Sequence, residues 1–259
     1  MLATPRTRED ARNDIADCCK TLYLSSNVRQ LCETQATPKQ EEFLLQVLQE
    51  ETAQREKKRI ARLLSRAGFP TLKSFDDYDF QAVQFPPALS RKALMKVDFI
   101  AEKKNLVLYG PVGTGKTHMA IALGLKACEM GLKTRFYSVT SLVLKLGEAW
   151  KNGTLERLVR DLHGLDLLIL DEWGYVPVDK DGSQLLFRIV ADSYEQKSLI
   201  LTTNLEFSKW GSIFTDEQMA AAMIDRLVHH GHLLIFDGES YRMKHALMRQ
   251  THAIQPQNG

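Results

Sequence analysis

One eight-residue segment has the residue types and spacing of a phosphate-binding loop: Gly110-Pro111-Val112-Gly113-Thr114-Gly115-Lys116-Thr117. It follows the apolar stretch 106–109 and opens a helical pattern, which is the context that a Walker A motif requires. The glycines allow backbone N–H groups to curl around phosphate oxygens, and the helix amino terminus adds positive partial charge. We expect Lys116 to bridge the β- and γ-phosphates and Thr117 to ligate Mg²⁺. A chance glycine-rich turn accounts for neither flanking element, so the segment predicts ATP and Mg²⁺ as ligands.

A second segment, 167–172, has the pattern of a Walker B motif. Its four apolar residues predict a strand buried on both faces, and Asp171 and Glu172 follow at the carboxyl end. Ligands bind at that end of the strands in open α/β sheets. We expect Asp171 to hold Mg²⁺ through its water shell and Glu172 to act as general base on the attacking water. An apolar run before Asp-Glu is common by itself, but downstream of a Walker A motif it indicates nucleotide hydrolysis.

Three further polar residues are candidates for the same site, and each has a structural alternative. Asn204 follows the predicted strand 198–202 and can position the attacking water, or it can cap the next helix. Arg226, late in the predicted helix 217–229, is either a surface salt-bridge residue or an arginine that stabilises transition-state charge on a neighbouring subunit's nucleotide. Arg242 follows the last predicted strand and can contact phosphate, or it is an exposed arginine at the strand end.

The elements that must position these residues alternate between strand and helix from Asn105 onward. This alternation predicts an α/β fold, a P-loop NTPase with a parallel sheet between two layers of helices. Strands are expected over 106–109, 134–139, 165–170, 198–202 and 233–236, with helices over 117–130, 184–194 and 217–229.

The residues before this region predict a small all-α N-terminal domain. Thr37, Pro38 and Gln40 form a capping box at the start of a long helix, and Gly68-Phe69-Pro70 ends it. Further prolines then indicate an irregular linker. We therefore expect a helical domain over 1–69, a linker over 70–90, an ATPase domain over 91–249 and a flexible tail over 250–259.

Composition places the chain among ordinary globular proteins. Its 259 residues are 44% hydrophobic and 25% charged, with 34 basic against 32 acidic side chains, which excludes a mainly disordered chain. No run approaches the ~18 apolar residues of a membrane span, and the amino terminus is polar. The four cysteines have no zinc-binding spacing. We expect reduced thiols, a cytoplasmic location and no membrane partner.

Clusters of basic residues are candidates for DNA contact. The segment 55–66 holds six basic residues against one acid, and apolar residues at helical spacing leave the charges on another face. Neutralised phosphates would give salt-dependent affinity without sequence information. The alternative is a solvated helix face. The candidates are Arg55, Lys57, Lys58, Arg59 and Arg62, with a second region at Lys145 and Lys151.

Taken together, these motifs resemble the AAA+ ATPases of the IstB/DnaC group, and most specifically the IstB transposition helpers. The similarity covers nearly the whole chain. It implies a bacterial ATPase with Asn204 as sensor 1, Arg226 as arginine finger and Arg242 as sensor 2. It also implies DNA, a DDE transposase and further copies of the chain as partners, with ATP sites shared between protomers. The marks are 61–70, 110–117, 168–177, 202–204, 225–226 with 229–230, and 238–242.

Several functions share this ATPase core. The reading that we favour is an oligomeric, DNA-binding ATPase that grips duplex target DNA and recruits the transposase. A DnaC-like helicase loader that acts on single-stranded DNA is the nearest alternative. A module in which ATP is only a structural ligand is a third, although Glu172 and Asn204 argue for turnover. Only 33 residues follow Arg226, so we expect no complete C-terminal helical lid.

Overall fold

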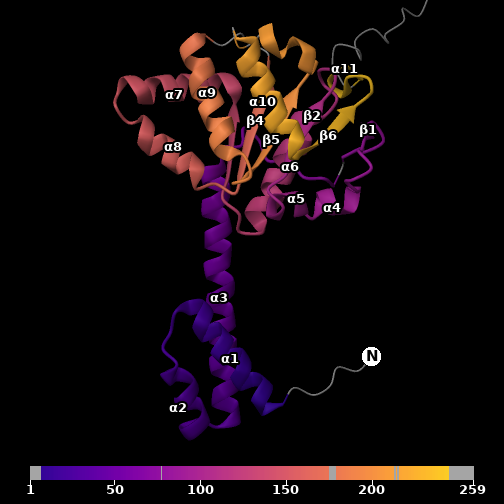
Figure 1. Cartoon of the computed structure of the whole chain (residues 1–259). Helices are drawn as coiled ribbons and strands as arrows, with labels where there is room; N and C mark the ends of the chain where they lie inside the picture. The colour runs from indigo at the N-terminus through magenta and orange to yellow at the C-terminus, as the bar shows by residue number, and fades with distance from the viewer. Residues whose placement is uncertain (1–6, 77, 175–178, 213, 215, 245–259) are drawn as a thin grey trace, which may run out of the picture. The chain divides into compact units, whose positions relative to one another are not determined.

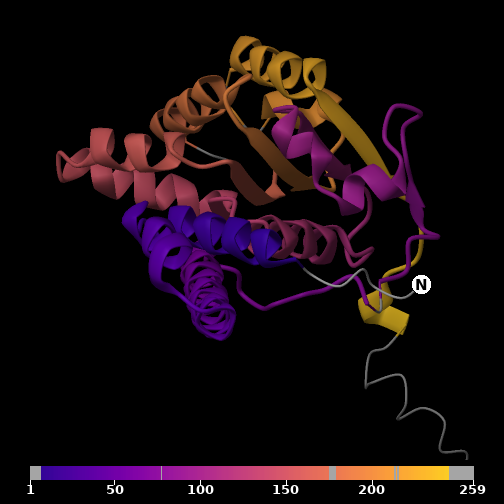
Figure 2. The same cartoon turned by 90° about the horizontal axis from the view of Figure 1, so that it is seen from below.

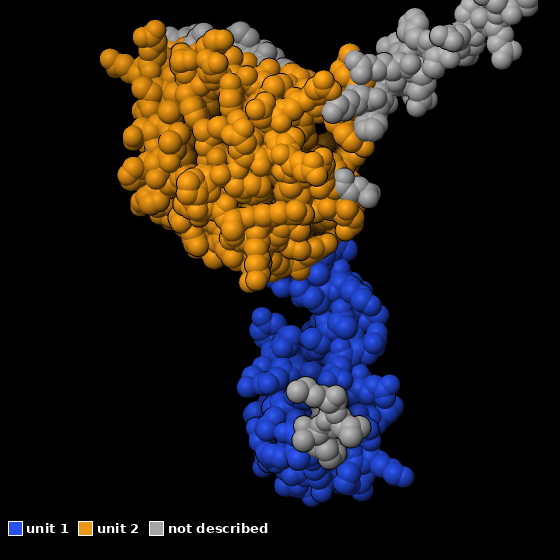
Figure 3. All heavy atoms as spheres, turned by 90° about the vertical axis from the view of Figure 1, so that its right-hand side faces the viewer, with its two compact units in different colours: residues 1–62 blue, residues 63–259 orange. Residues whose placement is uncertain are grey.

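The chain forms two compact units, residues 1–62 and 63–259 (Figure 3). The computed structural model describes residues 7–76, 78–174, 179–212, 214 and 216–244, apart from the side chains of Ser212, Arg242 and Lys244. The expected tail, 250–259, lies outside the described residues. The division falls before the expected boundary at 69, because the last helical turn from Leu63 belongs to the second unit. There the Arg135 guanidinium donates to the carbonyl of Arg66, and Phe69 packs edge-on against Phe136 at 6.2 Å.

The first unit is helical, as predicted (Figure 1). Helix α3 begins at the predicted capping box: the Thr37 N–H donates to Gln40 Oε1 at 2.8 Å, and the Gln40 N–H donates to Thr37 Oγ1 at 3.4 Å. A small apolar core joins the helices and includes Ile15 and Leu45. The helices are α1 (Arg8–Leu22), α2 (Asn27–Gln35) and α3 (Pro38–Ala67), of which residues 63–67 belong to the second unit.

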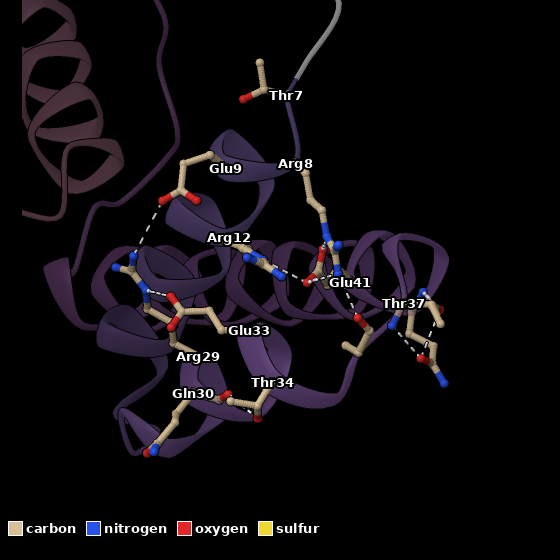
Figure 4. Close-up of polar contacts among 12 residues, drawn as sticks. Thr7, Arg8, Glu9, Arg12, Arg29, Gln30, Glu33, Thr34, Thr37 and Glu41 are labelled. Atoms are coloured by element: carbon tan, nitrogen blue, oxygen red, sulfur yellow. Dashed lines mark hydrogen bonds and ion pairs between the residues drawn. The ribbon is translucent and has the colours of Figure 1, made fainter.

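A buried carboxylate ties α1 to α3 (Figure 4). Glu41 is 1% exposed and accepts from Arg8 Nε at 2.7 Å and Arg12 Nε at 2.8 Å. The hydrogen bonds from Arg8, followed by those from Arg12, hold the pKa of Glu41 below its usual value. The ion pairs therefore keep a charge inside this small unit.

The second unit contains a six-stranded sheet in the order β1-β6-β2-β5-β4-β3. All neighbouring strands run parallel except β1, which pairs antiparallel with β6. The predicted parallel α/β sheet is thus confirmed, with one added edge strand. The strands are β1 (Val83–Gln84), β2 (Asn105–Tyr109), β3 (Thr134–Ser138), β4 (Leu167–Trp173), β5 (Ser198–Thr203) and β6 (Gly231–Phe236).

Helices cover both faces of the sheet (Figures 1 and 2). Alternate residues of β4 separate the two cores: Leu168 and Leu170 pack on one face, and Leu167 and Ile169 on the other. This explains the uninterrupted apolar run. One layer is α7 (Val139–Lys151), α8 (Leu155–His163), α9 (Lys180–Ser193) and α10 (Glu217–His229). The other is α4 (Arg91–Met95), α5 (Asp98–Ala101) and α6 (Lys116–Glu129), and η1 (Phe207–Ser212) and α11 (Tyr241–Lys244) complete the unit.

Residues 70–90, expected as a linker, contribute to this second unit. Val83 pairs with Phe236 in the sheet, and Phe80 and Val83 are both buried. Phe75 and Tyr78 pack with Phe80 as an aromatic cluster. The prolines predicted an irregular linker. The apolar side chains of the stretch instead pack in the core beside the folded sheet.

The structure can be compared with two further expectations, one about the cysteines and one about membrane-spanning segments. All four cysteines are free thiols, three of them buried. Among the described residues, no helix combines the length and apolar character needed to cross a bilayer.

Candidate functional site

The Walker A loop connects the end of β2 to the start of α6. Its first N–H, that of Gly110, donates to the Thr203 carbonyl of β5 at 3.2 Å, so the loop starts at the carboxyl edge of the sheet. Lys116 is buried, and its Nζ donates to the carbonyls of Gly110 at 2.7 Å and Pro111 at 2.6 Å. Thr114 Oγ1 donates to the Pro111 carbonyl at 2.8 Å. The loop thus surrounds its own ammonium group at a helix amino terminus.

Two glycines are required by close approach as well as by backbone conformation. At Gly113, with φ of 82°, a Cβ would lie 2.1 Å from Ser240 Oγ. At Gly110, a Cβ would lie 2.2 Å from the backbone oxygen of Phe236. The Tyr241 N–H also donates to the Gly113 carbonyl at 3.0 Å. The segment after β6 therefore lies against the loop, in contacts that tolerate no side chain at either position.

A buried hydroxyl–carboxylate cluster lies beside the loop. Asp171, 6% exposed, is the fifth of five consecutive buried residues in β4, and its Oδ1 accepts from Thr117 Oγ1 at 2.9 Å. The Thr202 hydroxyl of β5 donates to the same oxygen. The Thr202 Oγ1 in turn accepts the N–H of Glu172 at 3.0 Å. Walker A and Walker B residues, far apart in sequence, are thus joined by direct contact.

The exposed Glu172 has a strained backbone. Its φ is 63°, in the left-handed region, and the pairing of β4 with β5 is irregular between Leu170 and Trp173. Such a conformation costs about 1–2 kcal/mol in a non-glycine residue and persists where surrounding contacts fix it. Here the contact is the Thr202 hydroxyl. Asn204 is also exposed, directly after β5, whose Thr203 is paired with Tyr109 on one side and Trp173 on the other. Its backbone therefore lies between the Walker A and Walker B strands.

Tyr78 is a residue of this region that the sequence did not single out. Its hydroxyl donates to the Gly115 carbonyl at 3.3 Å, and its ring packs edge-on against His118 at 5.0 Å. The Nε2 of His118 lies 2.7 Å from the Ser74 carbonyl. Burial raises the pKa of the Tyr78 hydroxyl, which keeps it a donor. The many aromatic residues in 75–85 indicate a packed cluster, but no neighbouring sequence feature predicts that this cluster contacts the Walker A loop.

Of the two candidate arginines, Arg226 lies apart from the Walker A loop, whereas the backbone of Arg242 follows Tyr241, whose N–H donates to the Gly113 carbonyl. Arg226 lies near the end of α10, where the neighbouring Leu227 carbonyl accepts from Asn105 Nδ2 at 3.5 Å. Asn105 begins β2, whereas the Walker A loop follows its last residue, Tyr109. Four residues of strand span about 13 Å, so Arg226 lies toward the opposite edge of the sheet from its own Walker A loop. Arg242 lies in α11, and its side chain is outside the described part of the structure.

The predicted basic residues are surface residues. Arg55, Lys57, Lys58, Arg59 and Arg62 are all exposed on α3. Arg55 pairs with Glu51 at 2.7 Å and Arg59 with Glu56 at 3.3 Å, whereas neither lysine has an ion pair with a described residue. Lys145 and Lys151 are exposed on α7, with Lys145 Nζ 5.3 Å from the Tyr137 ring centre.

The residues of the site fit a nucleoside triphosphate with Mg²⁺. A buried ammonium at a helix amino terminus suits a polyphosphate. The Thr117 hydroxyl and the Asp171 carboxylate are hard oxygen ligands, which Mg²⁺ prefers. Within the described ranges, no group of three or more His, Cys, Asp or Glu side chains could hold a metal ion. Mg²⁺ requires none, because it binds through one or two carboxylates together with substrate phosphates.

Comparison with known proteins identifies the family. The profile of the IstB-like ATP binding proteins matches residues 23–249. A protein of Pseudomonas aeruginosa, named for an ATP-binding role in insertion sequence IS21, is 38% identical over 87% of this chain and 86% of its own length. A protein of Geobacillus stearothermophilus, similarly named for IS5376, is 36% identical over 81% of this chain and 83% of its own.

Solved structures support the fold. A DNA replication initiation factor superposes with a TM-score of 0.50 and 22% identity, over 62% of this chain and 48% of that one. The protein DnaI superposes with a TM-score of 0.50 and 19% identity, over 66% of this chain and 90% of that one. Both likenesses concern the fold alone. The chain has a Walker A loop in direct contact with a Walker B carboxylate, and both the family profile and the relatives cover most of its length. It therefore belongs to the family of IstB-like ATP-binding proteins of insertion sequences.

Proposed function

We propose that this protein is a Mg²⁺-dependent ATPase that assembles into oligomers on duplex DNA and assists transposition by gripping target DNA and recruiting the transposase. The observation that carries the proposal is the direct contact of Thr117 and Thr202 with Asp171 beside the Walker A loop. It joins a phosphate-binding loop to a carboxylate and to the adjoining Glu172. The relatives named for insertion sequences supply the biological setting.

Each residue has a role that follows from its position. Lys116 and the loop N–H groups would hold the phosphates, and Thr117 and Asp171 would hold Mg²⁺, which supplies charge neutralisation during phosphoryl transfer. Glu172 accepts a proton from the attacking water, and its backbone is fixed by Thr202. Asn204, exposed between the two Walker strands, orients that water.

The position of Arg226 supports the proposed oligomerisation. Because this residue lies toward the far edge of the sheet from its own Walker A loop, it would serve a neighbouring protomer. Head-to-tail contacts of this kind generate rings or open spirals. ATP binding would then favour assembly, and hydrolysis, promoted by the neighbour's Arg226, would release it. In this proposal Arg242 contacts phosphate within its own subunit.

The assembly cycle is tested by measuring particle mass with ATP on long duplex DNA and on single-stranded DNA. Large ATP-dependent particles on the duplex are the expected result. Lys116→Ala should abolish them, and Glu172→Gln should accumulate them because hydrolysis no longer releases the subunits. Particles confined to single-stranded DNA would indicate a helicase loader instead. An unstable Glu172→Gln assembly would contradict the proposed cycle.

DNA contacts are proposed for the exposed basic residues of α3 and, independently, for those of α7. Lys57 and Lys58 are the sharpest test, since both are exposed and neither is ion-paired with a described residue. Replacing both with glutamine should weaken binding and flatten its salt dependence, the slope falling by about 0.9 for each phosphate that is no longer neutralised. Lys20, exposed but paired with Asp17 at 2.9 Å, is the matched control. An unchanged salt slope would remove the α3 segment from the DNA surface.

A further inference from the structure

The surroundings of the Arg226 guanidinium differ from those of an ordinary structural arginine. Its Nη1 donates to the Ala222 carbonyl of its own helix at 3.0 Å, and its Cζ lies 5.3 Å from the centre of the Phe187 ring. No carboxylate among the described residues forms an ion pair with it. A half-buried guanidinium held by a carbonyl and a ring face keeps its charge available for an incoming anion.

The neighbouring helix contains a contrasting case. Arg188, next to Phe187 on α9, is bound to Glu156 at 2.8 Å and lies 3.7 Å from Asp192. Its charge is therefore committed to partners within the chain. Helices α9 and α10 pack against each other (Figures 1 and 2). The same helix pair therefore carries Arg188, which is ion-paired, and Arg226, which has no ion pair with a described carboxylate.

The position of Phe187 suggests how the difference is maintained. Its ring is half-buried and packed against the core between the sheet and the α7–α10 layer, which fixes its orientation. The ring face attracts the cation without neutralising it, whereas a carboxylate at the same place would compete with a phosphate. The ring therefore limits the positions open to the Arg226 side chain and, unlike a carboxylate, does not neutralise its charge.

Resting on the trans role proposed above for Arg226, we infer that Phe187 is a positioning residue that holds this guanidinium ready for the triphosphate bound by the adjacent protomer. Phe187 itself touches neither nucleotide nor reacting atoms. Its contribution is made through Arg226 and is realised only at a subunit junction.

The test uses mixed assemblies in which the two sides of a junction differ. Glu172→Gln subunits donate an intact Arg226 but cannot turn over, and Arg226→Ala subunits keep a working site but donate no arginine. Mixed assemblies should then turn over ATP faster than assemblies of either variant alone. The added turnover comes from junctions where a Glu172→Gln subunit donates Arg226 to the site of an Arg226→Ala subunit. Phe187→Leu, which keeps an apolar side chain of similar size, is added to one type at a time.

We expect Phe187→Leu in the donating subunit to lower mixed turnover about two- to fivefold, which corresponds to the ~0.5–1 kcal/mol of a cation–π contact that is partly exposed to solvent. In the accepting subunit it should change nothing. Phe187→Tyr, which keeps the ring, should restore turnover, and Arg188→Ala in the donor should not reproduce the loss. A general folding defect would instead lower turnover from either side.

The outcomes separate this inference from the proposed function. Suppose that mixing the two subunit types restores ATP turnover. The role of Phe187 is then overturned if Phe187→Leu lowers that turnover from both sides, from the accepting side alone, or from neither side. If mixing restores nothing, the trans role of Arg226 fails, and the inference falls with it.

Discussion

Replacing Thr202 with valine removes one hydroxyl on which two residues of the site depend. Thr202 is 2% exposed, and its hydroxyl donates to the Asp171 carboxylate and accepts the N–H of Glu172 at 3.0 Å. Valine has nearly the same shape, so the change deletes these two bonds without creating a cavity. The carboxylate keeps the bond from Thr117, but the strained Glu172 backbone loses its support.

The expected magnitude follows from these contacts. A hydrogen bond to a charged group contributes about 1.5–3 kcal/mol, and a neutral bond contributes about 1 kcal/mol. We therefore expect the free energy of unfolding of the second unit to fall by about 2–4 kcal/mol. For a unit of this size, each kcal/mol lowers Tm by about 2–4 °C, so the whole shift is roughly 4–16 °C.

The assay is thermal unfolding together with ATP turnover and nucleotide affinity. Turnover should fall by an order of magnitude or more, because the backbone of Glu172, the proposed general base, loses the hydrogen bond that fixes it, whereas affinity should change little. Thr202→Ser keeps the hydroxyl and loses one methyl group, worth about 0.8 kcal/mol, and is the control. Equal Tm and turnover in the valine and serine variants would refute the reasoning.

Two further predictions concern other contacts. Glu41→Gln should destabilise the first unit by about 1–3 kcal/mol near neutral pH, while Glu33→Gln, at an exposed i,i+4 pair with Arg29, should change it by under about 0.5 kcal/mol. Because the arginines lower the pKa of Glu41 in the folded state, its contribution is present above the unfolded pKa and lost as pH falls through the folded value. Circular dichroism melts from pH 7 to 3 should therefore show an acid-dependent loss of stability that Glu41→Gln lacks, and parallel curves would contradict the pairing. Tyr78→Phe should weaken ATP binding about threefold with Tm little changed, since it removes one long hydrogen bond to the Walker A loop; unchanged affinity by titration calorimetry would exclude a role for the hydroxyl.

Local sequence patterns were sufficient to predict those features that one short segment specifies. The run 110–117 specifies a loop that only glycine permits, and the capping box at Thr37 and Gln40 fixes where α3 begins. The apolar run 167–170 required a buried strand with Asp171 at its end. In each case the recognisable pattern lies within a few consecutive residues, so the sequence by itself determined the α/β order and both Walker motifs.

The remaining features depend on contacts between segments far apart in the chain. Val83 becomes a strand residue only because β6 offers an edge. Tyr78 meets Gly115 only because the folded core brings Tyr78 and Phe80 against α6. Thr202 reaches Asp171 because β5 lies beside β4, and Phe187 reaches Arg226 because α9 packs on α10. No spacing in the sequence encodes which side chains such packing brings together. The sequence therefore determined what chemistry the chain carries, and the tertiary structure decided which residues hold that chemistry in position.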